Sequence, residues 1–247
     1  MSQRPNLSLI TFVRTDYKED YIEQAVKEFS IHFRTKREYL KDFFRLIVIS
    51  KRWTKATLDN DIKSWTERFS HIYKGKSSKI TALVSNWFNQ CKDDKAINDL
   101  RGAIVEAFVL AYIDKNFKTN PENFGWGAKV IITESDDRKR DVIYRCTESP
   151  KPYPSCHDRS TVDVGFWDGR HGRFYECKVQ PATIQCKEIK YMSELDTQLS
   201  RLGVSYELFF VFLETRDSIE MRLADYKVKD FFFKLVGSNE LKDMLSA

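Results

Sequence analysis

The sequence of 247 residues predicts an α/β fold with an all-helical N-terminal region. Through residues 1–93, apolar side chains recur every three or four positions, which is the spacing of amphipathic helices. After Asn120 and Pro121, short segments of alternating apolar and polar residues replace that pattern, as is typical of strands. The 42% hydrophobic content allows a sizeable core. The length of 247 residues fits one large domain or two small ones.

Four short helices are expected in the N-terminal region. Their apolar stripes are rich in aromatic residues, which predicts that the helices pack together through these rings and expose their Lys and Arg residues. The stripes cover Tyr21–Phe29, Leu40–Ile47, Ile62–Phe69 and Ile80–Phe88.

A longer helix is expected from about Asp94 to Asn116, and the domain boundary is placed between residues 93 and 94. Its middle is apolar on every side and should therefore be buried, with Glu106 as the one ionisable group. A buried carboxylate is costly unless it is paired or bound to a metal. A salt bridge to Arg101 or Lys178 is the structural alternative to a metal.

The second half alternates strands and helices. Strands are expected at 128–133, 142–146, 161–166, 174–179 and 206–214. Helices are expected at 188–202, ended by Gly203, and at 218–224, 230–235 and 239–245.

Three charged residues on two neighbouring strands are the strongest functional signal. Glu176 and Lys178 are two apart and therefore project from the same face, while Cys177 projects from the other. A turn at Asp168-Gly169 would close a hairpin and bring Asp163 opposite this pair. Two acids can hold a divalent cation, and a lysine beside it can orient or deprotonate water.

A second Glu-x-Lys sequence, Glu188-Ile189-Lys190, is a weaker candidate. It begins a helical stretch, where residues two apart do not share a face. Asp168 could replace Asp163 as the acid, but its place before Gly169 favours a turn.

With Asp163, then Glu176-Cys177-Lys178, and Glu106 on a preceding helix, the chain resembles the PD-(D/E)XK nuclease superfamily over residues 94–215. The resemblance implies a restriction-endonuclease-like core, a mixed central sheet flanked by helices. It also implies that Asp163, Glu176 and the backbone carbonyl of Cys177 bind Mg²⁺, or Mn²⁺, with Glu106 joining the metal shell. Lys178 would position or activate water, and Gln180 would contact substrate or water. The family's leading proline is replaced by Val162.

The charge distribution favours a polyanionic partner. The net charge is +5, and the basic excess lies in the helical region. The candidate phosphate contacts are Arg34, Lys36, Arg37, Lys41, Arg45, Lys51, Arg52 and Lys55. The same region could instead bind a protein partner or form a homodimer.

A cytoplasmic location without a membrane partner is expected. The five cysteines include no Cys-x-x-Cys pair, the N-terminus lacks the apolar stretch of a secretory signal, and no apolar run could span a bilayer.

The expected activity is metal-dependent endonuclease cleavage of phosphodiester bonds. DNA is preferred as the substrate because most relatives in the superfamily cut DNA, in restriction, phage defence, repair or recombination. The alternatives are a ribonuclease with the same metal site and a catalytically silent nucleic-acid-binding or assembly protein that keeps the fold.

Overall fold

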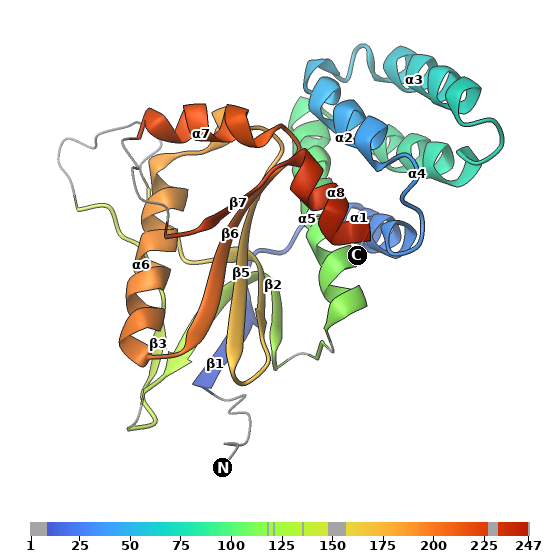
Figure 1. The fold of residues 1–247 in the computed structure, drawn as a ribbon. Coiled ribbons are helices and arrows are strands. Elements are labelled where there is room, and N and C mark those ends of the chain that lie inside the picture. Colours follow the sequence, from blue (N-terminus) through green and yellow to red (C-terminus); the bar gives the residue numbers. More distant parts are fainter. Residues whose placement is uncertain are drawn as a thin grey trace.

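A mixed seven-stranded sheet forms the centre of the computed structural model, which describes residues 9–117, 119–120, 122–134, 136–147, 157–226 and 232–246. Helices cover both faces of the sheet (Figure 1). The strand order is β1-β2-β4-β5-β6-β7, with β3 paired to β2. The strands are β1 (Ile10–Arg14), β2 (Phe124–Thr133), β3 (Lys139–Asp141), β4 (Val162–Trp167), β5 (His171–Lys178), β6 (Ser205–Phe212) and β7 (Lys234–Val236). The expected α/β class, with a mixed sheet flanked by helices, is confirmed.

The sheet changes direction at β5. Neighbouring strands from β1 to β5 are antiparallel, whereas β6 runs parallel to β5 and β7 runs parallel to β6. A tight turn joins β4 to β5, where Gly169 has a φ of 90°. That conformation favours glycine, so the predicted Asp-Gly turn is confirmed.

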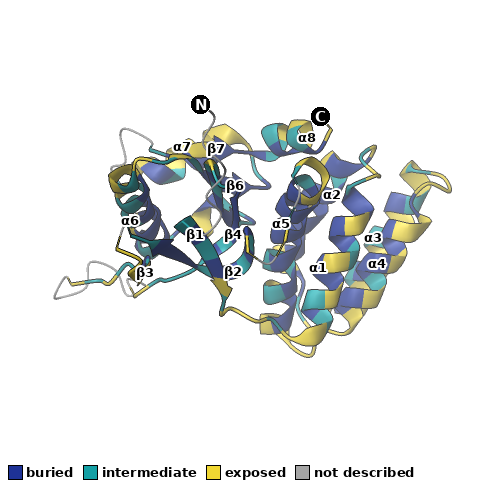
Figure 2. Ribbon diagram, turned by 90° about the horizontal axis from the view of Figure 1, so that it is seen from below, coloured by how far each residue is buried: buried dark blue, intermediate teal, exposed yellow. Residues whose placement is uncertain are grey.

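The helices lie in layers on either side of the sheet (Figure 2). One face carries α6 (Cys186–Leu202) and α7 (Arg216–Ala224), and Gly203 ends α6 in a left-handed conformation, φ 69°. The other face is covered by α5 (Asp94–Asn116), with α1 (Asp20–Phe33) and α8 (Ser238–Ser246) beside it. Farther from the sheet lie α2 (Leu40–Ile49), α3 (Leu58–Ile72) and α4 (Ser78–Asn89). Among the described residues, no helix is both long and apolar enough to cross a membrane.

One hydrophobic core joins the helical region to the sheet. It runs from aromatic residues of the first four helices, through Phe108 of α5, to Val164 and Tyr175 of the sheet. The apolar middle of α5 explains this continuity, because a helix that is apolar on every side must be covered on both sides. Residues on both sides of the domain boundary expected between residues 93 and 94 therefore pack into the same core, and the boundary stays a prediction.

The structure corrects three expectations. The N-terminal region is not all-helical, because Ile10–Arg14 forms an edge strand paired with β2. Residues 230 and 231 of the helix expected at 230–235 lie outside the described residues, and Lys234 and Leu235 belong to β7 (Lys234–Val236), since a short apolar run can be a strand as readily as a helix. The strand expected at 142–146 has a single bridge, between Tyr144 and Arg159.

A buried histidine in the helical region makes stability depend on pH. His32 of α1 is 2% exposed, and its Nε2 shares a hydrogen bond with the hydroxyl of Tyr39. Burial, together with the nearby Lys79 and Lys36, lowers the pKa of His32 to about 4. Below about pH 6.5 the unfolded chain binds a proton that the folded chain does not accept until about pH 4, so stability is lost as the pH falls through this window.

We expect the free energy of unfolding of the wild type, relative to that of His32→Gln, to fall by about 1 kcal/mol between pH 7 and pH 5. Glutamine keeps a hydrogen-bonding group near Tyr39 but does not titrate. Urea unfolding of both proteins at each pH measures the difference. An advantage that stays constant across this range would contradict the assignment.

Candidate active site

The end of the β4–β5 ladder fixes Asp163. The last ladder pair on this side joins Val164 to Tyr175. Beyond it, Asp163 Oδ2 accepts a hydrogen bond from the backbone N–H of Cys177 at 2.6 Å. The carboxylate is therefore held by the backbone of the neighbouring strand, next to Glu176.

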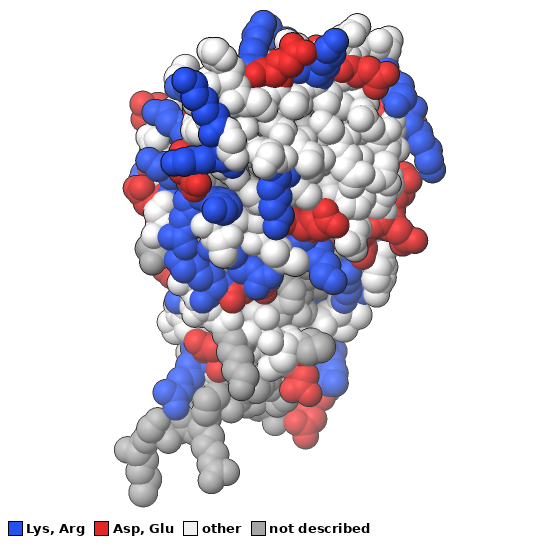
Figure 3. Space-filling model, turned by 90° about the vertical axis from the view of Figure 1, so that its right-hand side faces the viewer, with Lys and Arg blue, Asp and Glu red and all other residues white. Residues whose placement is uncertain are grey.

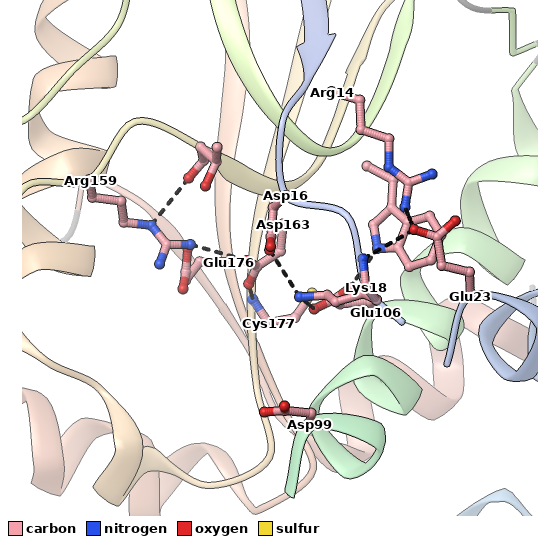
Figure 4. A network of polar contacts seen from close by, with 12 residues as sticks. Arg14, Asp16, Lys18, Glu23, Asp99, Glu106, Arg159, Asp163, Glu176 and Cys177 are labelled. Atoms are coloured by element: carbon pink, nitrogen blue, oxygen red, sulfur yellow. Dashed lines mark hydrogen bonds and ion pairs between the residues drawn. The ribbon is translucent and has the colours of Figure 1, made fainter. Parts of the chain in front are cut away.

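Arg159 bridges the two predicted acids (Figure 4). Its Nη2 lies 3.0 Å from Asp163 Oδ1 and 2.6 Å from Glu176 Oε2. On the other side of Glu176, Lys178 Nζ lies 2.7 Å from Oε1, an ion pair without the direction of a good hydrogen bond. The structure thus brings together the Asp163, Glu176 and Lys178 side chains, as the sequence predicted.

Glu188, which the sequence analysis set aside, belongs to the same cluster. Its Oε1 lies 3.4 Å from Lys178 Nζ and 3.6 Å from Arg159 Nη1. Its Oε2 accepts the backbone N–H of Gln185 at 2.7 Å, as part of a capping box at the start of α6. Glu188 therefore lies in the first turn of α6, although Gln185 is not one of the usual N-cap residues that would have signalled this from the sequence. Arg159 was missed because it lies outside any periodic segment.

Glu106 reaches the site from α5 on the other side of Asp163. Trp126 Nε1 donates a hydrogen bond to Oε2 at 2.5 Å, and Lys18 Nζ lies 3.7 Å from Oε1. The salt bridge that was the structural alternative for Glu106 is therefore present, but its partner is Lys18 rather than Arg101 or Lys178. Lys18 follows the edge strand β1, which the sequence analysis did not detect, so this partner had no predicted position.

Burial and charge shift the pKa of Glu106, Glu176 and Asp163. Burial raises the pKa of Glu106 to about 7, with Asp163 adding to the effect while Lys18 opposes it. Burial also raises the pKa of Glu176 to about 7, although Arg159 and Lys178 act against it. For Asp163, burial is outweighed by Arg159, Lys178 and the N–H of Cys177, so its pKa is lowered.

The bases are held in their charged forms. Burial opposes the ammonium of Lys178, but Glu176, Asp163 and Glu188 outweigh burial and raise its pKa. Burial likewise opposes the charge of Arg159, and the same three carboxylates raise its pKa. Both side chains therefore act as hydrogen-bond donors at neutral pH.

A cleft of about 740 Å³ opens on one side of this cluster. Asp163, Cys177, Lys178, Glu106 and Gln180 line it, whereas Glu176 is fully buried beneath. Five of the expected site residues thus line one cavity. The side chain of Cys177 is buried in the core, as expected, and the proposed role of its carbonyl stays a prediction.

None of the eight candidate phosphate contacts of the helical region lines this cleft. They are Arg34, Lys36, Arg37, Lys41, Arg45, Lys51, Arg52 and Lys55. Some are engaged elsewhere, since Arg37 donates to the carbonyl of Ser246 at 2.8 Å. Basic side chains gather on the left of the face in Figure 3, and uncharged residues cover much of its upper right. Contacts of this region with nucleic acid, a protein or a second copy stay predictions.

Asp163 and Glu176 offer the oxygen ligands that a hard cation prefers, but the guanidinium of Arg159 occupies the position between them. Asp163 and Glu176 both direct carboxylate oxygens at one positive group, and such oxygens are the ligands that Mg²⁺ and Mn²⁺ prefer. Within the part of the chain that the structure describes, no three His, Cys, Asp or Glu side chains form a group that could hold a metal as they stand. Binding a cation between Asp163 and Glu176 therefore requires Arg159 to move.

Comparison with known proteins adds no functional assignment. No protein-family model matches the chain, and no curated protein matches it significantly. One solved structure that is similar is that of protein VC1899 from Vibrio cholerae, with 11% sequence identity and a TM-score of 0.38. The alignment covers 94% of this chain and 56% of that one, so this chain spans little more than half of its length. A similarity at this level carries no argument about function.

Proposed function

We propose that this protein is a metal-dependent endonuclease that hydrolyses phosphodiester bonds, with DNA as the substrate. One observation supports this function above the others. A single nitrogen of Arg159 lies within hydrogen-bonding distance of both Asp163 and Glu176, so the two carboxylates are close enough to share one cation. Lys178 adjoins this pair and lines the cleft.

Each residue has a role that its surroundings allow. Asp163 and Glu176 would hold Mg²⁺ or Mn²⁺, with Glu106 joining them directly or through water. The bound ion supplies positive charge at the scissile phosphate and lowers the pKa of a water. Lys178 adjoins Glu176 and lines the cleft, so it would position or activate the attacking water and offset charge on the phosphate. Gln180 lines the same cleft and would contact substrate or water.

The Arg159 bridge favours a second candidate function. A guanidinium bound to both acids neutralises them without a metal, as a catalytically silent nucleic-acid-binding or assembly protein would require. The preference for DNA over RNA rests on the resemblance to the PD-(D/E)XK superfamily and is a proposal of the same standing.

Cleavage assays separate these functions. Purified protein is incubated with supercoiled plasmid, linear duplex, single-stranded DNA and RNA, each in Mg²⁺, Mn²⁺ or EDTA. We expect cleavage of DNA only with a divalent cation, and a loss of about 100-fold or more in Asp163→Asn, because a ligand of the metal is removed. Asp217→Asn, at an exposed aspartate of α7, is the matched control and should cleave normally.

Equal rates for Asp163→Asn and Asp217→Asn would refute the site. Cleavage of RNA alone would favour the ribonuclease, and no cleavage of any substrate would favour the silent protein. Thermal unfolding of both variants shows whether a lost activity reflects a lost fold.

A further inference from the structure

Arg101 is a cation without a counterion in the cleft. It lies on α5, is partly exposed and lines the same cavity as Asp163 and Glu106. Its Nε and Nη1 are shielded from solvent and have no hydrogen-bond partner. Neither an ion pair nor a hydrogen bond joins its side chain to any residue in the described parts of the chain.

The other four cations that line the cleft are all paired. Lys18 Nζ lies 2.9 Å from Asp16, and Lys95 Nζ lies 2.5 Å from Asp99. Arg159 and Lys178 are bound within the acidic cluster described above. Arg101 is thus the one cleft-lining cation, within the described residues, whose charge is not already engaged by a carboxylate.

This arrangement is unfavourable in the free protein. Burial lowers the pKa of Arg101 because no acid beside it compensates for the loss of water. Donor groups that have lost water and found no acceptor destabilise the fold. An anion in the cleft would satisfy Nε and Nη1 only after the guanidinium turns toward it, and a guanidinium then matches the paired oxygens of a phosphate or carboxylate.

The position of Arg101 fits the backbone of a strand that reaches the acidic cluster. It precedes Glu106 by five residues, which is about 7.5 Å along the helix axis. Successive phosphates of one B-DNA strand advance by roughly 3.4 Å along the duplex axis. A strand that lay parallel to α5 would therefore place a phosphate on Arg101 roughly two nucleotides from the level of Glu106.

We propose that Arg101 forms a phosphate subsite in the cleft, which binds the backbone of a nucleic acid strand beside the cluster of Asp163, Glu176 and Lys178. The identity of the ligand as a phosphodiester rests on the proposed function. The subsite itself rests on the partnerless guanidinium. Five acids and five bases line the cleft, so its net charge gives no general attraction for a polyanion, and binding there depends on specific donors such as Arg101.

Equilibrium binding tests the subsite without relying on cleavage. Fluorescence anisotropy is measured with fluorescein-labelled duplex DNA, single-stranded DNA and RNA over a range of salt concentrations. EDTA is present to stop metal-dependent cleavage. For the strand that binds, we expect Arg101→Gln to raise Kd about tenfold and to reduce the slope of log K against log salt by about 0.7 to 0.9.

Two further variants sharpen the result. Arg101→Lys keeps the charge but not the two-pronged geometry, so its Kd should lie between those of wild type and Arg101→Gln. Arg216→Gln removes an exposed arginine of α7, which lies outside the helical region and does not line the cleft, and should leave Kd and the salt slope unchanged. The midpoint of thermal unfolding of Arg101→Gln should equal or exceed that of the wild type, because the substitution removes a charge that has no partner.

An unchanged Kd and salt slope in Arg101→Gln would overturn the subsite, and so would the absence of binding to all three probes. These outcomes are independent of the cleavage assay. Weaker binding by Arg101→Gln together with no cleavage by the wild type would keep the subsite and reject the nuclease. Cleavage that depends on Asp163, with no effect of Arg101→Gln on binding, would do the reverse.

Discussion

Replacing Arg159 by alanine is expected to lower the free energy of unfolding by about 3–5 kcal/mol when no divalent cation is present. Arg159 lies 3.0 Å from Asp163, 2.6 Å from Glu176 and 3.6 Å from Glu188. Glu176 and Glu188 are buried, at 0% and 2% exposed. Removing the guanidinium leaves the three carboxyl groups with Lys178 as their nearest remaining base, so Glu176, whose pKa is already raised to about 7, either keeps an uncompensated charge or takes up a proton. Removing one partner of a buried ion pair costs more than removing one partner of an exposed pair.

A divalent cation should recover part of this loss. If Asp163 and Glu176 can hold Mg²⁺ or Mn²⁺, the ion takes the place that the guanidinium left, and it stabilises the folded chain according to its affinity and concentration. Thermal unfolding in EDTA and in increasing Mn²⁺ should therefore show a larger upward shift of the midpoint for Arg159→Ala than for the wild type. In the wild type the ion has to displace Arg159, which weakens apparent binding.

The matched control is Arg138→Ala. Arg138 is an exposed arginine with ion pairs to Glu134 and Asp136, and its removal should change stability by less than about 1 kcal/mol with no effect of Mn²⁺. An equal response of Arg159→Ala and wild type to Mn²⁺ would show that the acids form an ion-paired cluster and no metal site. A loss as small as that of Arg138→Ala would contradict the burial of the cluster.

Local patterns were sufficient to predict the centre of the site. The β4–β5 hairpin depends on period-two alternation and an Asp-Gly turn, both of which are contained in fewer than 20 consecutive residues. The long apolar helix α5 was equally clear, because its length and its apolar middle are properties of the segment itself. Asp163, Glu176, Lys178 and Glu106 were found because each lies within such a segment.

The partners of those residues were not predictable in the same way. Arg159 and Lys18 lie in irregular segments, and their positions follow from tertiary packing rather than from a repeat. The edge strand β1 is five residues long and acquires its structure by pairing with β2, more than 110 residues away along the chain. Glu188 and Lys190 lie two residues apart on a helix and therefore on different faces, which argued against them as a pair. The position of Glu188 in the first turn of α6 nevertheless brings it to Lys178.

These partners change what the predicted residues do. The sequence alone predicted acids that bind a metal. In the folded chain, each of these acids lies near a lysine or an arginine. Arg159 and Lys178 neutralise Asp163, Glu176 and Glu188, and Lys18 lies near Glu106. The cluster is therefore stable without a cation, and a metal would bind by exchange with an arginine. Metal binding at this site can therefore be tested in two independent ways, by the effect of the cation on stability and by its effect on the cleavage rate.

Lys178→Met is expected to reduce DNA cleavage by about 1000-fold at a temperature at which the variant is still folded. Lys178 is the base that adjoins both Glu176 and Glu188 and lines the cleft, so its ammonium can reach a water or a phosphate oxygen there. Methionine keeps the length and apolar stem of the side chain but removes the charge. Single-turnover cleavage under saturating Mg²⁺ measures the chemical step, and thermal unfolding defines the temperature range in which the variant is folded.

Lys190→Met is the control that the sequence itself provides. Lys190 ends the other Glu-x-Lys sequence, is exposed on α6 and does not line the cleft, so this variant should cleave at the wild-type rate. A large loss of cleavage in Lys178→Met with none in Lys190→Met would assign the chemistry to the first of the two Glu-x-Lys sequences. The difference between them would then come from their positions in the fold. Equal rates in the two variants would instead make Lys178 a counterion that holds Glu176 and Glu188 together, and the Arg159-bridged cluster would then be a structural centre without catalysis.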